Sequence, residues 1–392
     1  MDRKNRLYFS DEGILSSGKS ITADEAALIG RGASRLSRSI VVGVKASPTS
    51  EVLALAFSAA ALECGSDILF AGNVSLPELF YISNKTDEES IAVYISSVFY
   101  PSFRFFRRGG GELSRDKEEM LLESDNMKKE SFEIGKISDI SSFRVIYVSH
   151  LKRLLGEDSE KYESFPYSVV VNSPSERIRQ LFSEVLPKVD GNEVLAFHIS
   201  EDGVKCTAFT ESMGYIQCGK LMMLALKYRI KDFKGKAFRI PKDISGAAEK
   251  IAAEYGVKLE RTQEAELDFY YDKILLIVEI IKIIQKTGQK LDKLCEDLPK
   301  YAELDRYIPI EKESCTEKIK VLCNEYKNGK NYILDNKISG GVTINDALGR
   351  ISVTPIRSGK GIMLHAESTA MEAAAELCDH YERILHGEHD FR

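Results

Sequence analysis

The chain has 392 residues, a length that predicts about two to four compact domains, and its 43% hydrophobic and 29% charged residues are typical of a globular protein. Its formal net charge of -6 at pH 7 excludes a protein built for bulk binding to nucleic acid, whose phosphates attract basic surfaces. No two of the seven cysteines form a CxxC pair, so we expect neither a disulfide framework nor a zinc knuckle.

The chain also carries no signal for a membrane. Its first residues, MDRKNRLYFSDEG, have no apolar core of a signal peptide. The longest apolar stretch, 274–284, is interrupted by Glu279 and Lys282 and is too short to cross a bilayer. We therefore expect a cytoplasmic protein with no membrane partner and no nucleic-acid partner.

The first part of the chain alternates helices and strands. Thr22 and Glu25 form a capping-box pattern before an amphipathic helix, and a second helix over 49–64 stops at Gly65. Short apolar strands are predicted at 40–43 and 68–71, and the stretch 91–113 predicts two strands followed by a glycine turn. This order favours a mixed sheet covered by helices on both faces.

The segment between those two strands, 95–101, reads ISSVFYP and carries the main resemblance. It is similar to the active-serine loop I-T-A-S-H-N-P of the α-D-phosphohexomutases, which include phosphomannomutase, phosphoglucomutase and phosphoglucosamine mutase. The opening 8–14 resembles F-G-T-D-G-I-R-G of that family, and the order of elements is similar over nearly the full length. The resemblance implies a serine that carries a phosphoryl group, and Val98 stands in its place. Ser97 would supply the hydroxyl if the register of the loop slipped by one residue.

Two other first-part loops are also altered. Residues 44–50, with Lys45, stand where the family has G-R-D-T-R-x-S, and both arginines and the aspartate are absent. Arg107 and Arg108 precede three glycines, a pattern that would either hold an anion with backbone amides and guanidinium groups or form a solvated hairpin end. We favour the hairpin end.

In the second part, the strand 194–197 leads into HISEDG at 198–203. The family has D-G-D-x-D-R here, which implies Mg²⁺ held by three aspartates together with the phosphoserine. His198 and Ser200 take the places of the first two aspartates and only Asp202 remains, a poor set for Mg²⁺. We interpret this segment as a hairpin turn between two strands; the alternative is a softer metal held by His198 and Asp202.

In the third part, the strand 257–262 is followed by only a few residues before the next helix. The G-E-x-S-G-H motif that reads the sugar hydroxyls in the family is absent. The helix 272–287 is apolar on nearly all sides, which predicts burial within a domain or at a contact between subunits.

In the fourth part, the segment 354–361 reads TPIRSGKG where the family has R-P-S-G-T-E-P-K, the loop that grips the substrate phosphate. Arg357, Ser358 and Lys360 are donors beside two glycines and would form a phosphate cradle. The segment is equally consistent with a surface hairpin turn, and the sequence leaves both open.

These observations predict an α/β, phosphohexomutase-like architecture of three mixed α/β/α domains and a C-terminal α+β domain, with the second and third domains shortened. We expect the domains at 1–152, 153–231, 232–302 and 303–392. No metal and no cofactor is expected, Mg²⁺ being needed only if the chain is active. No catalytic residue is expected, and Ser97 is the candidate if the chain is active. The candidate ligand-binding residues are Lys45, Ser96, Ser97, His198, Asp202, Arg357, Ser358 and Lys360.

Three hypotheses for function follow. The first is a catalytically silent phosphohexomutase homologue that binds a sugar phosphate or a protein partner, because four catalytic loops are altered at once. The second is an active intramolecular phosphotransferase that uses Ser96 or Ser97 on a changed substrate. The third is a binding module that forms a homodimer through the helix 272–287.

Overall fold

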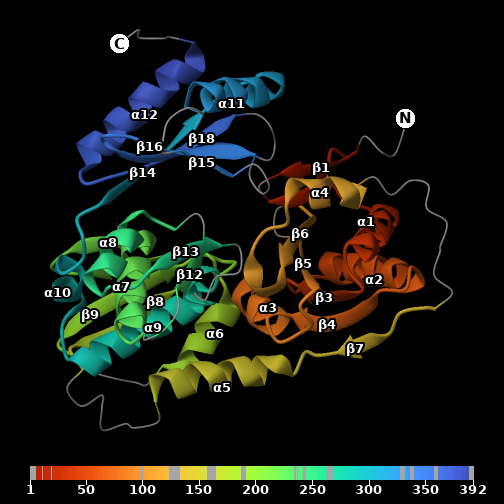
Figure 1. Ribbon diagram of the computed structural model, residues 1–392. Helices are drawn as coiled ribbons and strands as arrows, with labels where there is room; N and C mark the ends of the chain where they lie inside the picture. The colour runs from red at the N-terminus through yellow and green to blue at the C-terminus, as the bar shows by residue number, and fades with distance from the viewer. Residues whose placement is uncertain are drawn as a thin grey trace.

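Figure 1 shows the fold of the chain, a computed structural model coloured from the N-terminus to the C-terminus. The residues that the structure describes are 6–10, 12–18, 20–97, 100–122, 133–156, 165–186, 191–233, 235, 237–241, 244–262, 268–326, 332–335, 340–356 and 361–387.

The first part is built on a seven-stranded mixed sheet in the order β1-β2-β6-β5-β3-β4-β7. Strands β3, β4, β5 and β7 run parallel, whereas β6 pairs antiparallel with β5 and β2. The strands are β1 Leu7–Ser10, β2 Gly13–Ser16, β3 Ser39–Val44, β4 Asp67–Asn73, β5 Ile91–Ser96, β6 Ser102–Arg107 and β7 Ile137–Asp139.

Helices cover both faces of this sheet, as the element order predicts. Two hydrophobic clusters separate along β3: Ile40, Val42 and Val44 pack toward α1 and α2, and Val41 packs toward α3. Thr22 caps α1 in the predicted box, since its hydroxyl accepts the Glu25 N–H at 3.2 Å and its N–H donates to Glu25 Oε2 at 2.8 Å. The helices are α1 Ala23–Leu36, α2 Pro48–Glu63, α3 Leu76–Ser83, α4 Arg115–Leu122 and α5 Phe143–Leu155.

The middle of the chain forms a four-stranded sheet and a two-stranded parallel sheet, in the orders β11-β10-β9-β8 and β12-β13. A single hydrophobic cluster from Tyr147 to Leu298 contains core residues of both sheets and of the helices around them. The elements are β8 Tyr167–Asn172, α6 Glu176–Val185, β9 Glu193–Ile199, β10 Cys206–Thr210, β11 Gly214–Gln217, α7 Cys218–Lys231, β12 Phe238–Pro241, α8 Ala247–Glu254, β13 Leu259–Thr262, α9 Lys273–Thr287 and α10 Leu291–Glu296.

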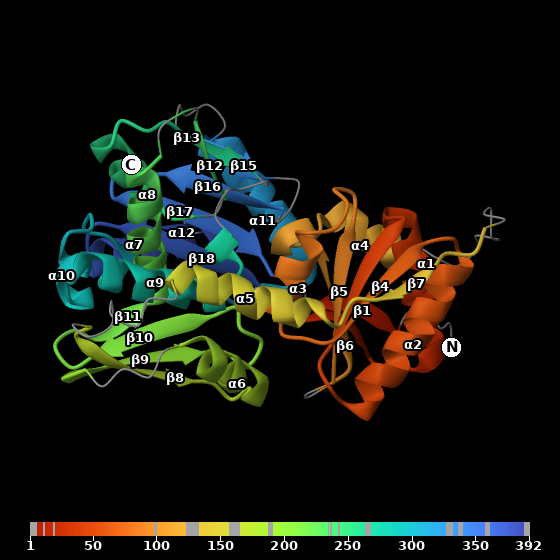
Figure 2. The same cartoon turned by 90° about the horizontal axis from the view of Figure 1, so that it is seen from below.

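Helix α9 is the apolar helix of the sequence, and it lies inside this core. It contacts α5 and α7, and its side chains from Ile274 to Val278 are at most 4% exposed. Figure 2 shows α5 extending from the first sheet alongside the middle part, next to α9. The apolar character of α9 is therefore explained by burial within one chain, and the homodimer stays a prediction.

The last part is an antiparallel five-stranded sheet in the order β14-β18-β17-β16-β15, with α11 and α12 packed on one face. The alternation of side chains along β14 and β18 puts Leu304, Ile308, Leu364 and Ala366 in the core beneath α12. The elements are β14 Ala302–Ile308, α11 Lys312–Tyr326, β15 Tyr332–Asp335, β16 Gly341–Asn345, β17 Gly349–Pro355, β18 Ile362–Ser368 and α12 Met371–His386.

The mixed α/β architecture of several sheet-based parts is thus as predicted, whereas the domain boundaries and the shortening of the second and third domains stay predictions. Within the described residues, no helix is both long enough and apolar enough to cross a membrane.

Candidate functional site

Three serine hydroxyls meet at the carboxyl ends of strands β3 and β5. Ser97 follows β5, and its Oγ lies 2.5 Å from Ser47 Oγ and accepts a hydrogen bond from Ser50 Oγ at 3.1 Å. Ser47 Oγ also donates to Ser50 Oγ at 2.9 Å, so the three form a closed triangle, which we call the hydroxyl cluster. Ligands of open α/β sheets bind at this edge, which makes the cluster a candidate site.

The hydroxyl cluster lies at the N-terminus of helix α2. Ser47 is the N-cap, its Oγ accepts the Ser50 N–H at 3.0 Å, and Pro48 occupies the first turn, where its missing N–H costs nothing. The dipole of a 16-residue helix favours negative charge here. A phosphoryl group on Ser97 would therefore meet a helix terminus and two hydroxyls.

Residues 200–205 form the hairpin turn between β9 and β10, and the sequence predicts a turn within this segment. Ser200 N–H donates to Lys205 C=O at 2.9 Å, and Gly203 has a positive φ of 83° that only glycine adopts without strain. Asp202 stabilises the turn, since its Oδ1 accepts from Ser200 Oγ at 2.6 Å and from the Val204 N–H at 3.3 Å.

Two ion pairs join this turn to the first sheet. Lys45, just after β3, binds the Glu201 carboxylate, and Arg104 on β6 binds Asp202 Oδ2 at 3.1 Å. The four side chains are between 25% and 40% exposed, so the pairs are partly shielded from solvent. The turn thereby docks beside the carboxyl ends of β3 and β5.

The same contact surrounds a buried tyrosine. Tyr94 on β5 stands opposite Arg104 in the β5–β6 register and is 5% exposed. Burial raises the pKa of Tyr94 far above its ordinary value, and the negative charge of Asp202 adds to this shift. Tyr94 therefore stays neutral and does not serve as a base.

A hollow of about 520 Å³ opens at the carboxyl ends of β8 and β9. Three of its lining side chains, Arg179, His198 and Lys205, carry or can carry positive charge. We call it the cationic hollow, and its full lining is Asn172, Ser173, Pro174, Arg179, His198, Ile199, Ser200, Lys205, Cys206 and Thr207. Its size suits a small phosphorylated molecule.

The turn does not offer a ready set of ligands for Mg²⁺. Asp202 is the one carboxylate at the three positions that correspond to the family's aspartates, and Arg104, Ser200 and the Val204 amide already bind it. The ring of His198 packs against the Tyr215 ring, with centroids 6.0 Å apart. As these side chains stand, they do not fit a hard cation that prefers several free carboxylate oxygens.

The structure brings together some of the predicted site residues and leaves others undescribed. Lys45, Ser97 and Asp202 lie around the contact between the first sheet and the turn, and Ser96 is the last residue of β5, paired with Ser102. Arg357, Ser358 and Lys360 lie outside the described residues, and so does Val98. These assignments stay predictions.

Sequence reasoning missed four participants: Ser47, Ser50, Arg104 and Glu201. Only Ser47 had a signal, because a serine before proline at a helix start is typical of an N-cap. The ion pair of Lys45 with Glu201 joins residues 156 positions apart, which no local pattern reveals.

The two arginines of the glycine turn bind backbone carbonyls. Arg107 Nε donates to the Glu112 carbonyl at 3.0 Å, and Arg108 donates to the Asn84 carbonyl at 2.9 Å. This arrangement fits the hairpin end, although both side chains are partly buried rather than simply solvated.

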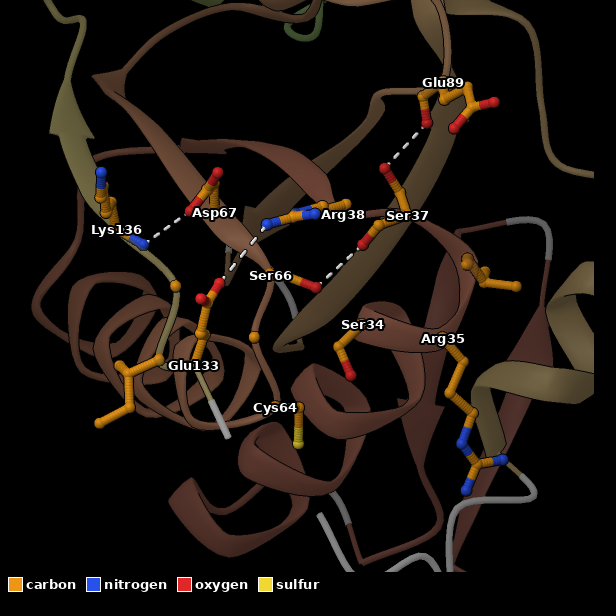
Figure 3. Close-up of a pocket in the computed structure, with 14 residues that line it drawn as sticks. Ser34, Arg35, Ser37, Arg38, Cys64, Ser66, Asp67, Glu89, Glu133 and Lys136 are labelled. Atoms are coloured by element: carbon orange, nitrogen blue, oxygen red, sulfur yellow. Dashed lines mark hydrogen bonds and ion pairs between the residues drawn. The ribbon is translucent and has the colours of Figure 1, made fainter. Parts of the chain in front are cut away.

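A second polar cavity of about 780 Å³ lies at the other edge of the first sheet, where β3 and β4 begin (Figure 3). Its charged groups include Arg38 and Glu133, which pair at 4.0 Å while more than 80% exposed, and Lys136, whose N–H donates to Asp67 at 2.7 Å. Ion pairs this exposed contribute little. Because it opens at the amino ends of the strands, we do not assign the function to it.

Comparisons with known proteins agree on one group of enzymes, although no family model matches the chain. The phosphoglucosamine mutase of Dictyoglomus thermophilum is 27% identical over 214 residues, which cover 51% of this chain and 45% of that enzyme. That of Dictyoglomus turgidum is 23% identical over 403 aligned positions, which cover 83% of this chain and 90% of the enzyme. A solved phosphoglucomutase/phosphomannomutase family protein of Burkholderia thailandensis has a TM-score of 0.69 at 14% identity, and the match covers 99% of this chain and 98% of that one.

One expectation is contradicted. We expected no cofactor, yet an N-acetylphosphoglucosamine mutase of Aspergillus fumigatus was solved in complex with GlcNAc-6P and magnesium. That structure is 9% identical with a TM-score of 0.49, so it places no ion in this chain. The expectation of no cofactor concerned this chain and rested on one altered loop, and the magnesium-bound structure contradicts it. By fold and by sequence similarity, this chain resembles the α-D-phosphohexomutases, and its low identity to them makes it a divergent relative.

Proposed function

We propose that this chain binds a phosphorylated sugar and has little or no mutase turnover of its own. The observation that carries the proposal is the pairing of Glu201 with Lys45 and of Asp202 with Arg104. Through these pairs the chain's own cations hold the carboxylates of the turn that corresponds to the family's metal loop.

Binding is supported by the chemistry of the cationic hollow. Arg179, His198 and Lys205 supply donors for phosphate oxygens, and the hollow lies where parallel strands β8 and β9 end. Lys205 also lies near the fourth sheet: the pKa of Asp305 on β14 is lowered by its hydrogen bond with His365 and, to a smaller extent, by the charge of Lys205.

Weak turnover is supported by the surroundings of Ser97. Within the described residues its hydrogen-bond partners are two other hydroxyls, and a serine needs a base or a metal to become a good nucleophile. The carboxylates that could act on it from the turn are both in ion pairs.

The test measures binding and turnover on the same preparation, with Mg²⁺ present throughout. Calorimetry with glucosamine-6-phosphate should give saturable binding that Lys205→Met weakens by about 10-fold, since a charge-assisted hydrogen bond is lost. Lys136→Met, in the cavity at the opposite edge of the first sheet, is the matched control and should bind like the parent chain. A coupled mutase assay with a sugar bisphosphate activator should show no turnover above background.

Two results would overturn the proposal. Turnover at ordinary enzymatic rates, about 1 s⁻¹ or faster, would refute the weak-turnover part. Binding that is absent, or equally affected by Lys205→Met and Lys136→Met, would refute the assignment to the cationic hollow.

A second function is favoured by the hydroxyl cluster, namely phosphoryl transfer through Ser97. In that reaction Ser97 Oγ bonds to the phosphorus of a sugar bisphosphate, the bond from phosphorus to the sugar oxygen breaks, and the hydroxyl proton passes to that oxygen. Incubation with glucose-1,6-bisphosphate and Mg²⁺ would then add one phosphoryl group per chain, located on Ser97 by peptide mass spectrometry. Ser97→Ala should abolish the addition and Ser96→Ala should not; an unmodified parent chain rules this function out.

A further inference from the structure

Four ionisable side chains form two cross-strand pairs on the fourth sheet. In the antiparallel register of β14 and β18, Glu303 stands opposite Glu367 and Asp305 stands opposite His365. Because side chains alternate along a strand, all four lie on the face away from α12. This face meets the first turns of helices α7 and α8, where Gly219 and Gly246 contact the glutamates.

Three of these side chains converge on one point. A carboxylate oxygen of Glu303, a ring nitrogen of His365 and a carboxylate oxygen of Glu367 all lie within 4.8 Å of one another. His365 Nε2 lies 3.4 Å from Glu367 Oε1. Ligand atoms about 2.1 Å from one tetrahedral ion lie about 3.4 Å apart, so this pair is already spaced as two ligands of the same ion.

The fourth side chain fixes the histidine for this role. His365 Nδ1 lies 2.6 Å from Asp305 Oδ1, a hydrogen bond that holds the ring and directs the lone pair of a neutral imidazole to Nε2. An imidazole held by a carboxylate on its outer nitrogen is the usual arrangement behind a metal-bound histidine.

Glu367 is also held from behind. Its Oε2 accepts the Gly246 N–H at 2.6 Å and the Ser245 hydroxyl at 3.1 Å, which leaves Oε1 for the point of convergence. The side chain is 8% exposed, so its orientation is set by these two donors rather than by solvent. Hydrogen bonds of this kind orient metal-ligating carboxylates.

Glu303 fits a space that only glycine leaves open. A Cβ on Gly219 would lie 2.5 Å and 2.8 Å from the Glu303 carboxylate oxygens and 2.9 Å from the Tyr301 hydroxyl. That hydroxyl is buried and has no hydrogen-bond partner within the described residues. An orphaned buried donor beside a carboxylate indicates a missing group, such as an ion or its bound water, that would satisfy it.

Glu303 and Glu367 face each other in this cluster, and His365 lies beside Glu367. Like charges directly opposite each other on neighbouring strands repel. A divalent cation between the two carboxylates would remove this repulsion. It would also bind the lone pair on His365 Nε2, which is available when Nδ1 donates to Asp305.

We propose that Glu303, His365 and Glu367 bind a divalent first-row transition ion, of which Zn²⁺ is the best fit. One imidazole and two carboxylates suit zinc, with a fourth position left for water, whereas Mg²⁺ prefers an all-oxygen octahedral set. His365 is 33% exposed, so an ion can enter from solvent. This site is separate from the 198–205 turn and ties the fourth sheet to the first turn of α8.

The test uses the full-length, tag-free chain, stripped with a chelator, and Zn²⁺ or Co²⁺ alone as the probe. Calorimetry should show one Zn²⁺ per chain, and Co²⁺ should give the d–d absorption of a site with a nitrogen ligand. Glu303→Gln, which keeps the side-chain volume, should weaken Zn²⁺ affinity by about 10-fold or more. Glu372→Gln, at an exposed acid of the same part of the chain, should leave affinity unchanged.

A second variant distinguishes a loss of metal affinity from a folding defect. Asp305→Asn leaves all three ligands in place and should reduce Zn²⁺ affinity by about 10-fold through loss of orientation, with the circular dichroism spectrum unchanged. The proposal is overturned by the absence of stoichiometric binding to the parent chain. It is equally overturned by binding that Glu303→Gln and His365→Asn both leave intact.

Discussion

The contact between helices α3 and α6 gives the sharpest prediction for stability. Glu78 is completely buried, and its carboxylate accepts hydrogen bonds from Arg177 Nε at 2.6 Å and from Arg177 Nη2 at 2.8 Å. The N–H and hydroxyl of Ser75 also donate to it, at 2.7 Å and 2.8 Å, in a capping box. Arg144 approaches at 3.8 Å. One buried charge thus joins α3 of the first part to α6 of the second.

The perturbation is Arg177→Met, which keeps the aliphatic stem and removes the guanidinium. Breaking a buried ion pair from one side costs about 3–5 kcal/mol, because the other charge stays buried without its partner. Arg177 is 23% exposed, and Ser75 and Arg144 still stabilise the carboxylate, so we expect a loss of about 3 kcal/mol in the free energy of unfolding. Adding Glu78→Gln to the Arg177→Met chain removes the buried charge, and the new glutamine can still accept the Ser75 N–H. The double variant should therefore regain about half or more of the lost free energy of unfolding.

The assay is urea unfolding at pH 7, monitored by far-ultraviolet circular dichroism. The transition at the lowest urea concentration is analysed, because a chain of several parts need not unfold in two states. Arg179→Met is the matched control: it lies on the same helix, and its hydrogen bonds end on the Ser173 and Pro174 carbonyls rather than on a carboxylate. The reasoning is refuted if Arg177→Met costs no more than Arg179→Met, or if adding Glu78→Gln deepens the loss.

Three further predictions concern single residues. Burial raises the pKa of the Asp272 carboxyl to about 6, so the stability that its neutral form contributes is present below about pH 4 and is lost as pH rises through about 6. This contribution to the free energy of unfolding amounts to about 3 kcal/mol. Asp272→Asn should remove this pH dependence from unfolding curves measured between pH 4 and pH 7. Gly203→Ala should cost about 1–3 kcal/mol by calorimetry and weaken sugar-phosphate binding, because φ is 83° and the new Cβ would lie 2.8 Å from the Pro77 ring. The hydrogen bond from the Cys206 thiol and the charge of Lys273 lower the pKa of Cys218, so iodoacetamide at pH 7 should modify Cys218 before Cys206 in peptide mass spectrometry; the reverse order contradicts the assignment.

Local chemistry was readable from the sequence, and long-range pairing was not. The Thr22–Glu25 capping box and the stop of α2 before Gly65 follow from neighbouring residues, and both are present. The hairpin at Gly203 follows from turn chemistry in the same way. Such features depend on the backbone within a few residues, which is why motif reasoning succeeds there.

The candidate site depends on contacts that no short motif contains. Arg104 and Asp202 are 98 positions apart, and Glu303 and Glu367 meet only because of the β14–β18 register. The wrong expectation about a cofactor came from the altered 198–203 loop alone, because the loss of two aspartates there was interpreted as the loss of any need for a metal. The apolar helix α9 was recognised, but its burial inside one chain depends on α5 and α7, which the pattern alone does not specify.

The shared core of the middle part has a consequence for folding during synthesis and for truncated fragments of this protein. The hydroxyl of Tyr147 on α5 donates to Asp272, the N-cap of α9, at 2.7 Å, so the core is closed by two segments 125 positions apart. When synthesis has reached only α7, helix α9, which fills this core, has not yet been made. The apolar faces of strands β8 to β11 then stay exposed to solvent. We therefore expect a fragment ending near residue 231 to aggregate, and one that extends past Leu298 to fold.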